Sequence, residues 1–269
     1  MSLLSTSDVS QFMQRGWCVL KGAFTAEQAR AARAVVWRRM EQKRGIRETD
    51  PSTWPPAYDI EEILTEPEVV GCFTDRLAEA VGELLGPDRW SGVRRWGFWP
   101  VNFHFGADAP KRWPEWGWHV DGNWFRHTID APNQGLLLIG LFSDVAEGGG
   151  GTVVASGSHR RAARVLAAHP GGLTHTELFK LVLSDPIGGF CELTGAAGDV
   201  VFGHPFLFHT RGYKRTGPPR FISNTETPLR APLQIERSEG DYSILERSIR
   251  AALMEPPSPV PVDGMLCRF

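Results

Sequence analysis

The second half of the chain is a succession of short strand-like runs separated by glycine and proline, and this pattern limits the fold more than any other feature. From Gly92 onward, β-branched and aromatic residues gather in brief runs with turn residues between them. Such spacing is typical of an all-β sandwich or barrel. The expected strands lie at 95–105, 135–142, 152–155, 189–193, 199–209 and 220–225.

The first ninety residues have a different, helical character, interrupted by one short apolar run at 17–20 that predicts a strand. The sequence Thr25-Ala26-Glu27-Gln28 has the capping-box pattern that opens a helix. The expected helices lie at 7–16, 25–43, 66–85, 161–169, 174–183 and 242–253.

A chain of 269 residues is long for one domain, but all-β barrels and sandwiches often reach this size as a single unit. No repeat period is visible. We therefore expect one domain over residues 1–269, with a helical part at 1–90, a β-core at 91–226 and a C-terminal helix and tail at 227–269.

Composition and charge exclude several classes of protein. The 29 basic residues nearly balance the 31 acidic ones, whereas a nucleic-acid-binding domain is usually clearly basic. The longest apolar run, 135–142, is too short to cross a bilayer, and no signal peptide is recognisable at the N-terminus. The four cysteines are scattered, without metal-binding spacing, which favours free thiols in a reducing compartment. We expect a cytoplasmic protein whose partner is a small molecule and neither nucleic acid nor membrane.

The segment 116–122, Trp-Gly-Trp-His-Val-Asp-Gly, is the most informative for chemistry. Residues two apart on a strand project from the same face, so His119 and Asp121 can bind one ion together if the segment is extended. Two further histidines, His204 and His209, follow on a later expected strand. Two histidines and one carboxylate form the ligand set that binds Fe(II) on one face and leaves other positions open.

Strand parity separates the two candidates for the third ligand. On a regular strand, His204 faces the same way as Phe206 and Phe208, whereas His209 faces the opposite way with Leu207. Only one of the two histidines could then reach the ion that His119 binds.

Arg220 adds a possible anion-binding group to this set. It follows the turn at 214–219, and a hairpin through that turn would bring its guanidinium beside His209. A guanidinium is the side chain suited to holding a carboxylate between two parallel hydrogen bonds.

Taken in order, these motifs resemble those of the phytanoyl-CoA dioxygenase family of Fe(II)/2-oxoglutarate oxygenases. The family pattern is His-x-Asp, a glycine-rich turn ending in Gly-Ser-His, and a strand carrying His and, eleven residues later, Arg. The chain has His119 and Asp121, the segment 148–159, His209 and Arg220. Its N-terminal segment is similar as well, so the resemblance spans about residues 8–226.

The resemblance implies a fold, a metal and a reaction. The fold would be a double-stranded β-helix, a jelly-roll core braced by the N-terminal helices. His119, Asp121 and His209 would hold Fe(II), and 2-oxoglutarate would chelate this iron while Arg220 pairs with its other carboxylate. With O2, such an enzyme would oxidise, and most simply hydroxylate, an unactivated C–H bond of a small metabolite or natural-product intermediate, forming succinate and CO2. Desaturation and ring closure are the alternative outcomes.

Further contacts to 2-oxoglutarate are expected from two earlier strands. Thr152 follows the glycine-rich turn and could donate a hydrogen bond to the distal carboxylate. Asn102 precedes the His-x-Asp segment, with His104 at even spacing as an alternative. His159, at the end of the Gly-Ser-His turn, is expected to cap the following helix.

The substrate pocket is expected beside the metal ligands. Trp124 and Phe125, just after Asp121, are candidate pocket walls. Relatives often carry Gly-Ser after the distal histidine, where this chain has Thr210-Arg211. Arg211 is therefore expected either to contact the substrate or to replace Arg220 as the carboxylate anchor.

Two other classes of function compete with the oxygenase. A non-redox, metal-dependent enzyme of the cupin type would use the same triad without 2-oxoglutarate. A non-catalytic β-sandwich binding module would explain the 10 tryptophans, but it gives no reason for the triad together with Arg220. Halogenases related to the family replace the metal-binding carboxylate by a small residue, so Asp121 disfavours that activity.

Overall fold

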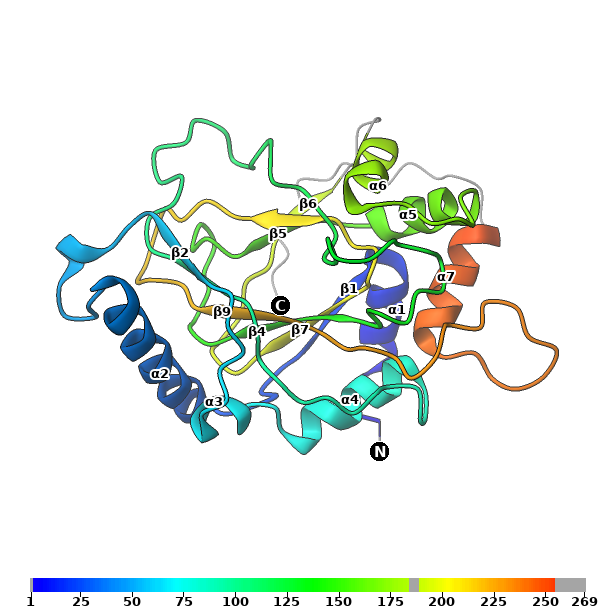
Figure 1. Cartoon of the computed structure of the whole chain (residues 1–269), viewed down its shortest axis with the longest axis horizontal. Helices are drawn as coiled ribbons and strands as arrows, with labels where there is room; N and C mark the ends of the chain where they lie inside the picture. Colours follow the sequence, from blue (N-terminus) through cyan, green and yellow to red (C-terminus); the bar gives the residue numbers. More distant parts are fainter. Residues whose placement is uncertain (1, 184–188, 255–269) are drawn as a thin grey trace.

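The computed structural model describes residues 2–183 and 189–254 (Figure 1). The helices are α1 (Thr6–Arg15), α2 (Ala26–Arg44), η1 (Pro51–Thr53, a 3-10 helix), α3 (Pro67–Val70), α4 (Asp75–Leu85), α5 (Ser158–Ala167), α6 (His175–Val182) and α7 (Ile244–Met254). The strands are β1 (Trp17–Leu20), β2 (Ala57–Ile60), β3 (Trp99–Asn102), β4 (Leu137–Leu141), β5 (Thr152–Ala155), β6 (Phe190–Glu192), β7 (Val200–Gly203), β8 (His209–Arg211) and β9 (Ile222–Glu226).

Two antiparallel sheets face each other and form the core. One has the strand order β1-β7-β4-β9 and the other β6-β5-β8, while β2 and β3 pair separately. Apolar side chains from both sheets fill the space between them; they are Trp17, Leu137, Ile139, Leu141, Val145, Val154, Cys191, Leu193, Val201, Leu207 and Ile222. The mainly-β jelly-roll core expected from the sequence is confirmed.

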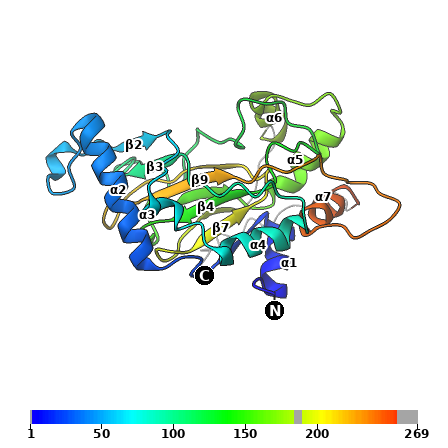
Figure 2. The same cartoon turned by 60° about the horizontal axis from the view of Figure 1, so that its bottom comes forward.

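Helices cover the outer face of the four-stranded sheet. Figure 2 shows α2, α3 and α4 lying along β9, β4 and β7. Because side chains alternate along a strand, Leu138 and Phe202 point outward and join the buried cluster that α2 and α4 supply. The remaining helices, α1, α5, α6 and α7, gather at one end of the sheets. The N-terminal helices thus brace one sheet, as expected.

Capping residues set the bounds of the N-terminal helices. The Thr25 hydroxyl accepts from the N–H of Gln28, and the Gln28 side chain accepts in return from the N–H of Thr25, so the expected capping box opens α2. The single helix expected over 66–85 is instead two, α3 and α4. A new N-cap at Thr74, whose hydroxyl accepts from the N–H of Leu77, restarts the chain as α4.

The expected strand over 199–209 is broken in the structure. β7 ends at Gly203, and a turn follows in which the N–H of Leu207 donates to the carbonyl of His204 at 2.9 Å. Pro205 lies in this turn and has no N–H to continue a strand ladder. The parity argument between His204 and His209 therefore does not apply, since the two residues do not share a regular strand.

The expected hairpin from His209 to Arg220 is also wrong. β8 pairs with β5, whereas β9 pairs with β4, so the turn at 214–219 carries the chain from one sheet to the other. The first ninety residues likewise contribute strands to the β-structure, because β1 pairs with β7 and β2, which the sequence did not predict, pairs with β3.

Two further sequence expectations concern the membrane and the cysteines. In the described part of the chain, no helix has both the length and the apolar character needed to cross a bilayer. Cys18 and Cys72 are buried free thiols, and burial raises the pKa of Cys72 to about 12. Cys191 is disulfide-bonded in the structure, which corrects the expectation of a free thiol at this position.

Candidate metal centre

The three side chains expected to bind a metal converge at one end of the smaller sheet. His209 opens β8, and a backbone bridge joins it to His119 in the loop that precedes β4. Asp121 follows two residues later. One ligand atom from each of the three lies within 4.8 Å of the others, a spacing that fits a single ion.

Hydrogen bonds orient both imidazole rings in the same way. Nδ1 of His119 lies 2.7 Å from the carbonyl oxygen of Gly117, and Nδ1 of His209 lies 3.1 Å from that of Leu207. A proton on each Nδ1 would be donated to these carbonyls, which leaves the two Nε2 atoms unprotonated. Metal-binding histidines are characteristically held by such a bond from the other ring nitrogen.

Nε2 of His209 is buried and has no hydrogen-bond partner in the described structure. Oδ1 of Asp121 lies 3.5 Å from it, and Nε2 of His119 lies 3.4 Å from the same oxygen. A buried polar atom without a partner costs free energy, so such atoms call for an explanation. A metal ion between these atoms supplies one, and this donor set of two imidazoles and one carboxylate suits divalent iron.

The charges in the site favour a positive charge beside Asp121. Burial alone would raise the pKa of Asp121, but His209 and His119 hold it far below its usual range. Burial alone would lower the pKa of His119, but the hydrogen bond and the charge of Asp121 raise it above the usual value. Asp121 is therefore an anion at neutral pH and is available as a ligand.

His204 lies in the core and not at this centre. Its Nδ1 accepts from the N–H of Phe206 at 3.1 Å, and its ring lies 4.8 Å from that of His159. Burial holds its pKa well below the usual value. The sequence suggested that the His159 side chain caps the following helix, but α5 begins at Ser158 and has no side-chain cap. Nε2 of His159 lies 3.1 Å from the carbonyl of Met13 and ties α5 to α1.

Arg220 is almost fully buried, with 1% of its surface exposed. Its Nε donates to the carbonyl of Gly150 at 2.7 Å and its Nη1 to that of Pro100 at 2.6 Å. Burial lowers its pKa to about 9, with a further contribution from the cationic Arg211. It remains a cation at neutral pH. Nη2 donates to no acceptor in the described residues, so one edge of the guanidinium is available for a ligand.

Thr152 and Arg211 lie on the same face of the sheet as His209. Thr152 is opposite Arg211 in the β5–β8 register, and Val154, which packs between the two sheets, is opposite His209. Residues directly opposite on antiparallel strands share a face. The Arg211 guanidinium pairs with Asp59 of β2 and lies over the ring of Phe105.

Asn102 lies at the end of β3, where its amide is occupied by backbone contacts. Its Nδ2 donates to the carbonyl of Gly212 at 3.0 Å, and its Oδ1 accepts from the N–H of Phe105 at 3.1 Å. It also exchanges backbone hydrogen bonds with Arg220. Asn102 thus fixes the strand segment beside Arg220. His104, its alternative, is exposed.

Trp124 and Phe125 lie in the loop after Asp121. Trp124 is 62% exposed, and its ring meets that of Phe125 at 5.7 Å in an edge-on arrangement. The Phe125 ring packs against His127 with a centroid distance of 4.5 Å. On the other side of His119, Trp116 is also 62% exposed. Aromatic residues therefore precede and follow His119 and Asp121 along the chain.

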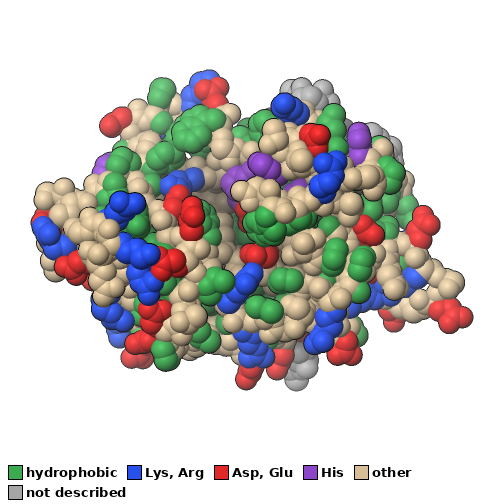
Figure 3. Space-filling model, viewed as in Figure 1, with side chains coloured by type: hydrophobic (Ala, Val, Ile, Leu, Met, Phe, Trp, Pro, Cys, Tyr) green, Lys and Arg blue, Asp and Glu red, His purple; other side chains and the backbone are tan. Residues whose placement is uncertain are grey.

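A hollow opens on the face of the molecule seen in Figure 3. Histidine side chains (purple) lie at its rim, with acidic and basic side chains across from them. The side chain of His119 is 42% exposed, whereas that of His209 is 2% exposed.

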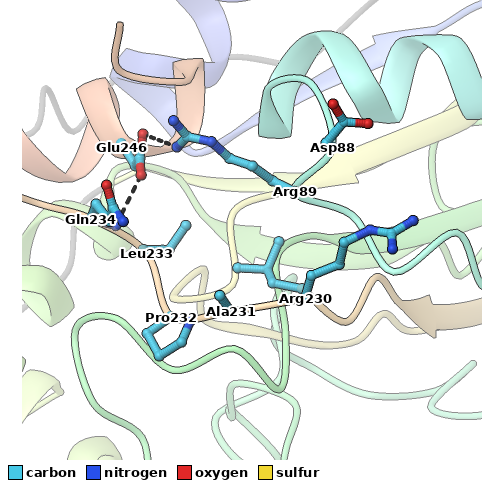
Figure 4. A pocket seen from close by; sticks show the side chains of 9 residues that line it. Asp88, Arg89, Arg230, Ala231, Pro232, Leu233, Gln234 and Glu246 are labelled. Carbon is cyan, nitrogen blue, oxygen red and sulfur yellow. Dashed lines mark hydrogen bonds and ion pairs between the residues drawn. The ribbon is translucent and has the colours of Figure 1, made fainter. Parts of the chain in front are cut away.

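Another cavity, of about 240 Å³, contains none of the residues expected to be functional (Figure 4). Its charged wall residue Glu246 pairs with Arg89 and also accepts from the backbone N–H of Gln234 at 2.9 Å. The lining residues are Asp88, Arg89, Leu229, Arg230, Ala231, Pro232, Leu233, Gln234 and Glu246. The carboxylate is already satisfied by the protein, so this cavity is a weak candidate for catalysis.

Sequence reasoning missed two carboxylates near the site. Asp59, which pairs with Arg211, lies on the short strand β2 that follows a proline-rich loop. Glu192 of β6 accepts hydrogen bonds from the glycine-rich turn at 148–151. Each depends on a contact between segments far apart in the sequence, and no local motif marks either.

A family model matches most of the chain. It is the model of phytanoyl-CoA dioxygenase (PhyH), and it matches residues 12–222. No curated protein matches the chain at a significant level.

Several solved structures share the fold at low sequence identity. EctD from S. alaskensis, solved with 2-oxoglutarate and 5-hydroxyectoine, is 18% identical with a TM-score of 0.51, covering 83% of this chain and 75% of that chain. EvdO2 from Micromonospora carbonacea var. aurantiaca is 16% identical with a TM-score of 0.51, covering 90% and 97%. The carbocyclase SnoK from nogalamycin biosynthesis is 15% identical with a TM-score of 0.51, covering 96% and 93%.

Proposed function

The chain belongs to the phytanoyl-CoA dioxygenase family, and from this premise we propose that His119, Asp121 and His209 bind the catalytic iron of a 2-oxoglutarate-dependent oxygenase. The observation that carries the proposal is the buried Nε2 of His209, which has no hydrogen-bond partner in the described structure and lies beside the Asp121 carboxylate. A bound cation would give Nε2 of His209 a partner and would neutralise the Asp121 carboxylate. No thiolate is present among the three, which favours iron over the softer metals that cysteine selects.

The cosubstrate of this enzyme class is 2-oxoglutarate, and Arg220 is the residue proposed to bind its distal carboxylate. The guanidinium is buried and held by two backbone carbonyls, with Nη2 left over. A buried cation needs an anion, and a charge-assisted bond to a carboxylate is among the stronger hydrogen bonds. The Thr152 hydroxyl, on the face shared with His209, is proposed as a further donor. Asn102 is proposed to act by holding the segment beside Arg220.

The substrate is proposed to be a small molecule that approaches from the exposed side of His119. Trp124 and Phe125 are proposed to line its path, because exposed aromatic side chains beside a site are typical of ligand-binding surfaces. Arg211 is proposed to contact the substrate, since it shares the inner face with His209 and part of it is exposed.

Iron, 2-oxoglutarate and O2 together supply an oxidant able to attack an unactivated C–H bond, with succinate and CO2 as coproducts. Hydroxylation is the reaction proposed for this chain. The residues described above bind and orient: the triad holds the metal by one face, and Arg220 fixes the cosubstrate.

All of these groups are proposed to belong to one catalytic domain spanning the chain. The N-terminal part is not separable from the β-core, because β1 completes the four-stranded sheet next to β7 and β2 carries the Asp59 that pairs with Arg211.

The proposal is tested by following the products with a panel of candidate small molecules. The purified enzyme with Fe(II), ascorbate and O2 should convert 2-oxoglutarate to succinate, and the true substrate should stimulate this conversion. Mass spectrometry should find a substrate product heavier by one oxygen atom. Metal-dependent turnover without consumption of 2-oxoglutarate would instead favour the cupin-type alternative.

A further inference from the structure

The glycine-rich turn at 148–151 closes around the carboxylate of Glu192. Oε1 accepts from the backbone N–H groups of Gly150 at 2.9 Å and Gly151 at 2.8 Å, and Oε2 accepts from that of Gly148 at 2.8 Å. Gly148 and Gly150 have φ angles of 72° and 79°, which allows neighbouring N–H groups to point inward together. Such a concave set of N–H groups is an anion-binding site. Here the protein fills it with its own carboxylate.

One peptide group of this turn links Glu192 to Arg220. The N–H of Gly151 donates to Glu192, and the carbonyl of Gly150, in the same peptide group, accepts from Nε of Arg220 at 2.7 Å. The peptide is therefore polarised between an anion on one side and a cation on the other. Hydrogen bonds in such a chain strengthen one another, and bonds to charged groups are the stronger ones.

The turn has no room for a side chain at Gly150 or Gly151. A Cβ atom at Gly150 would lie 2.7 Å from Nδ2 of Asn102 and 2.9 Å from Cβ of Lys214. A Cβ at Gly151 would lie 2.1 Å from the carbonyl oxygen of Leu193. This packing explains why glycine stands at both positions, and the Gly150 carbonyl is bonded to Arg220.

Glu192 also supplies a negative charge close to a buried cluster of cations. Burial lowers the pKa of Arg220, as does Arg211, whereas Asp59 and Glu192 oppose this change. Burial lowers the pKa of Lys214, on the turn beside Gly150, and Arg220 lowers it further, whereas Glu192 opposes this change. Burial raises the pKa of Glu192 itself, and its three N–H partners oppose the rise.

We propose that Glu192 is a positioning residue for 2-oxoglutarate, which acts through the Gly150–Gly151 peptide to hold Arg220 toward the distal carboxylate. Glu192 need not touch the cosubstrate. This inference rests on the proposed function, because it assigns Arg220 its role at the same site.

The test uses two oxo acids that differ only at the distal end. 2-Oxoglutarate carries the distal carboxylate, whereas 2-oxopentanoate has the same carbon chain without it. Each is titrated anaerobically into the Fe(II)-loaded protein, and the visible charge-transfer absorbance of the chelate gives a dissociation constant. Fe(II) affinity is measured separately without an oxo acid.

Three variants make the comparison specific. Glu192→Gln removes the charge and places an amide N–H among N–H donors. Glu192→Asp keeps the charge but shortens the reach. Glu147→Gln is the matched control, since Glu147 lies next to the same turn with its side chain 56% exposed.

Glu192→Gln should weaken 2-oxoglutarate binding about tenfold, which corresponds to about 1.4 kcal/mol. It should leave the affinities for 2-oxopentanoate and Fe(II) unchanged, and Glu147→Gln should match the wild type throughout. In the background of Arg220→Ala, the Glu192→Gln change should have no further effect on 2-oxoglutarate.

An unchanged affinity for 2-oxoglutarate, or an equal loss for both oxo acids, would overturn the positioning role. If Glu192→Gln does not fold, Glu192→Asp provides the test. A loss of affinity for 2-oxoglutarate alone would support the positioning role. An equal loss for both oxo acids, or no loss, would overturn it. A wild-type protein that forms no chelate with either oxo acid would instead overturn the proposed function.

Discussion

His119 and His209 exchange both of their backbone hydrogen bonds, with N···O distances of 3.0 Å and 2.9 Å. The bridge places their ring centroids 4.4 Å apart, and Oδ1 of Asp121 lies 3.4 Å and 3.5 Å from the two Nε2 atoms. The backbone therefore sets the spacing of the two imidazoles before any ion binds. A site fixed in this way loses little conformational freedom on binding a metal.

Alanine at His119, Asp121 or His209 should abolish iron-dependent turnover. Fe(II) affinity should fall by more than about 100-fold, because even losing a group that only orients a ligand costs about 10–100-fold. Equilibrium dialysis against Fe(II) under anaerobic conditions measures the affinity. The control is His204→Ala, which should bind Fe(II) as the wild type does. An inactive His204→Ala together with an active His209→Ala would contradict the assignment.

Arg220→Ala should weaken 2-oxoglutarate by at least about tenfold, since a hydrogen bond to a charged group contributes about 1.5–3 kcal/mol. Arg220→Lys should recover only part, because an ammonium group cannot reproduce the planar geometry of guanidinium. Fe(II) affinity without 2-oxoglutarate should stay the same in both variants. Arg211→Ala is the comparison: if it loses 2-oxoglutarate while Arg220→Ala retains it, the two roles are exchanged.

Metal substitution should separate binding from chemistry. Two imidazoles and a carboxylate bind several divalent metals, so Zn(II), Co(II) and Ni(II) should occupy the site and compete with Fe(II). None of them should support formation of succinate. Competition dialysis and a succinate assay on the same samples check both statements. Zinc-supported turnover equal to that with iron would favour a hydrolase or isomerase.

The buried pair His159 and His204 should make the protein less stable in weak acid. Burial lowers the pKa of His159 to about 3 and that of His204 well below its usual value, whereas both titrate near about 6.5 when unfolded. The unfolded chain therefore binds more protons below about pH 6.5, and stability falls as the pH drops through this range. Between pH 7 and pH 5.5 His159 should account for about 1 kcal/mol of this loss, and His204 should add to it in the same direction.

His204→Asn tests this effect, because asparagine does not titrate but can still accept from the N–H of Phe206. Urea unfolding of the metal-free proteins at the two pH values should show a smaller loss of stability in the variant than in the wild type. An identical loss in both proteins would show that His204 does not cause it.

The sequence predicted the fold class and the residues that meet at the metal centre. Local signals carried part of these predictions: the spacing of His119 and Asp121, the capping box at Thr25, and the short strand-like runs of β4 and β5. Each of these depends on neighbours within a few residues, which is what local sequence can specify. The choice of His209 as the third residue came from the resemblance to the family, because its contact with His119 joins segments far apart in the sequence.

The wrong predictions concern features that depend on how distant segments of the chain pack together. A regular strand through His204 and His209 was expected, but Pro205 and the turn around it interrupt the strand. A hairpin was expected to bring Arg220 beside His209. Instead the backbone of Arg220 forms a bridge with that of Asn102, and its guanidinium donates to the carbonyl of Gly150. The carboxylate of Glu192 inside the glycine turn has no local signature either, because β6 and the turn come together only in the fold.

The most direct test of the central claim is an anaerobic titration of the Fe(II)-loaded protein with 2-oxoglutarate, followed by visible absorbance. The wild type should develop a charge-transfer band that saturates at one 2-oxoglutarate per chain. His209→Ala should develop none, because the chelate needs iron held by the triad. Absence of the band in the wild type, or its persistence in His209→Ala, would contradict the account.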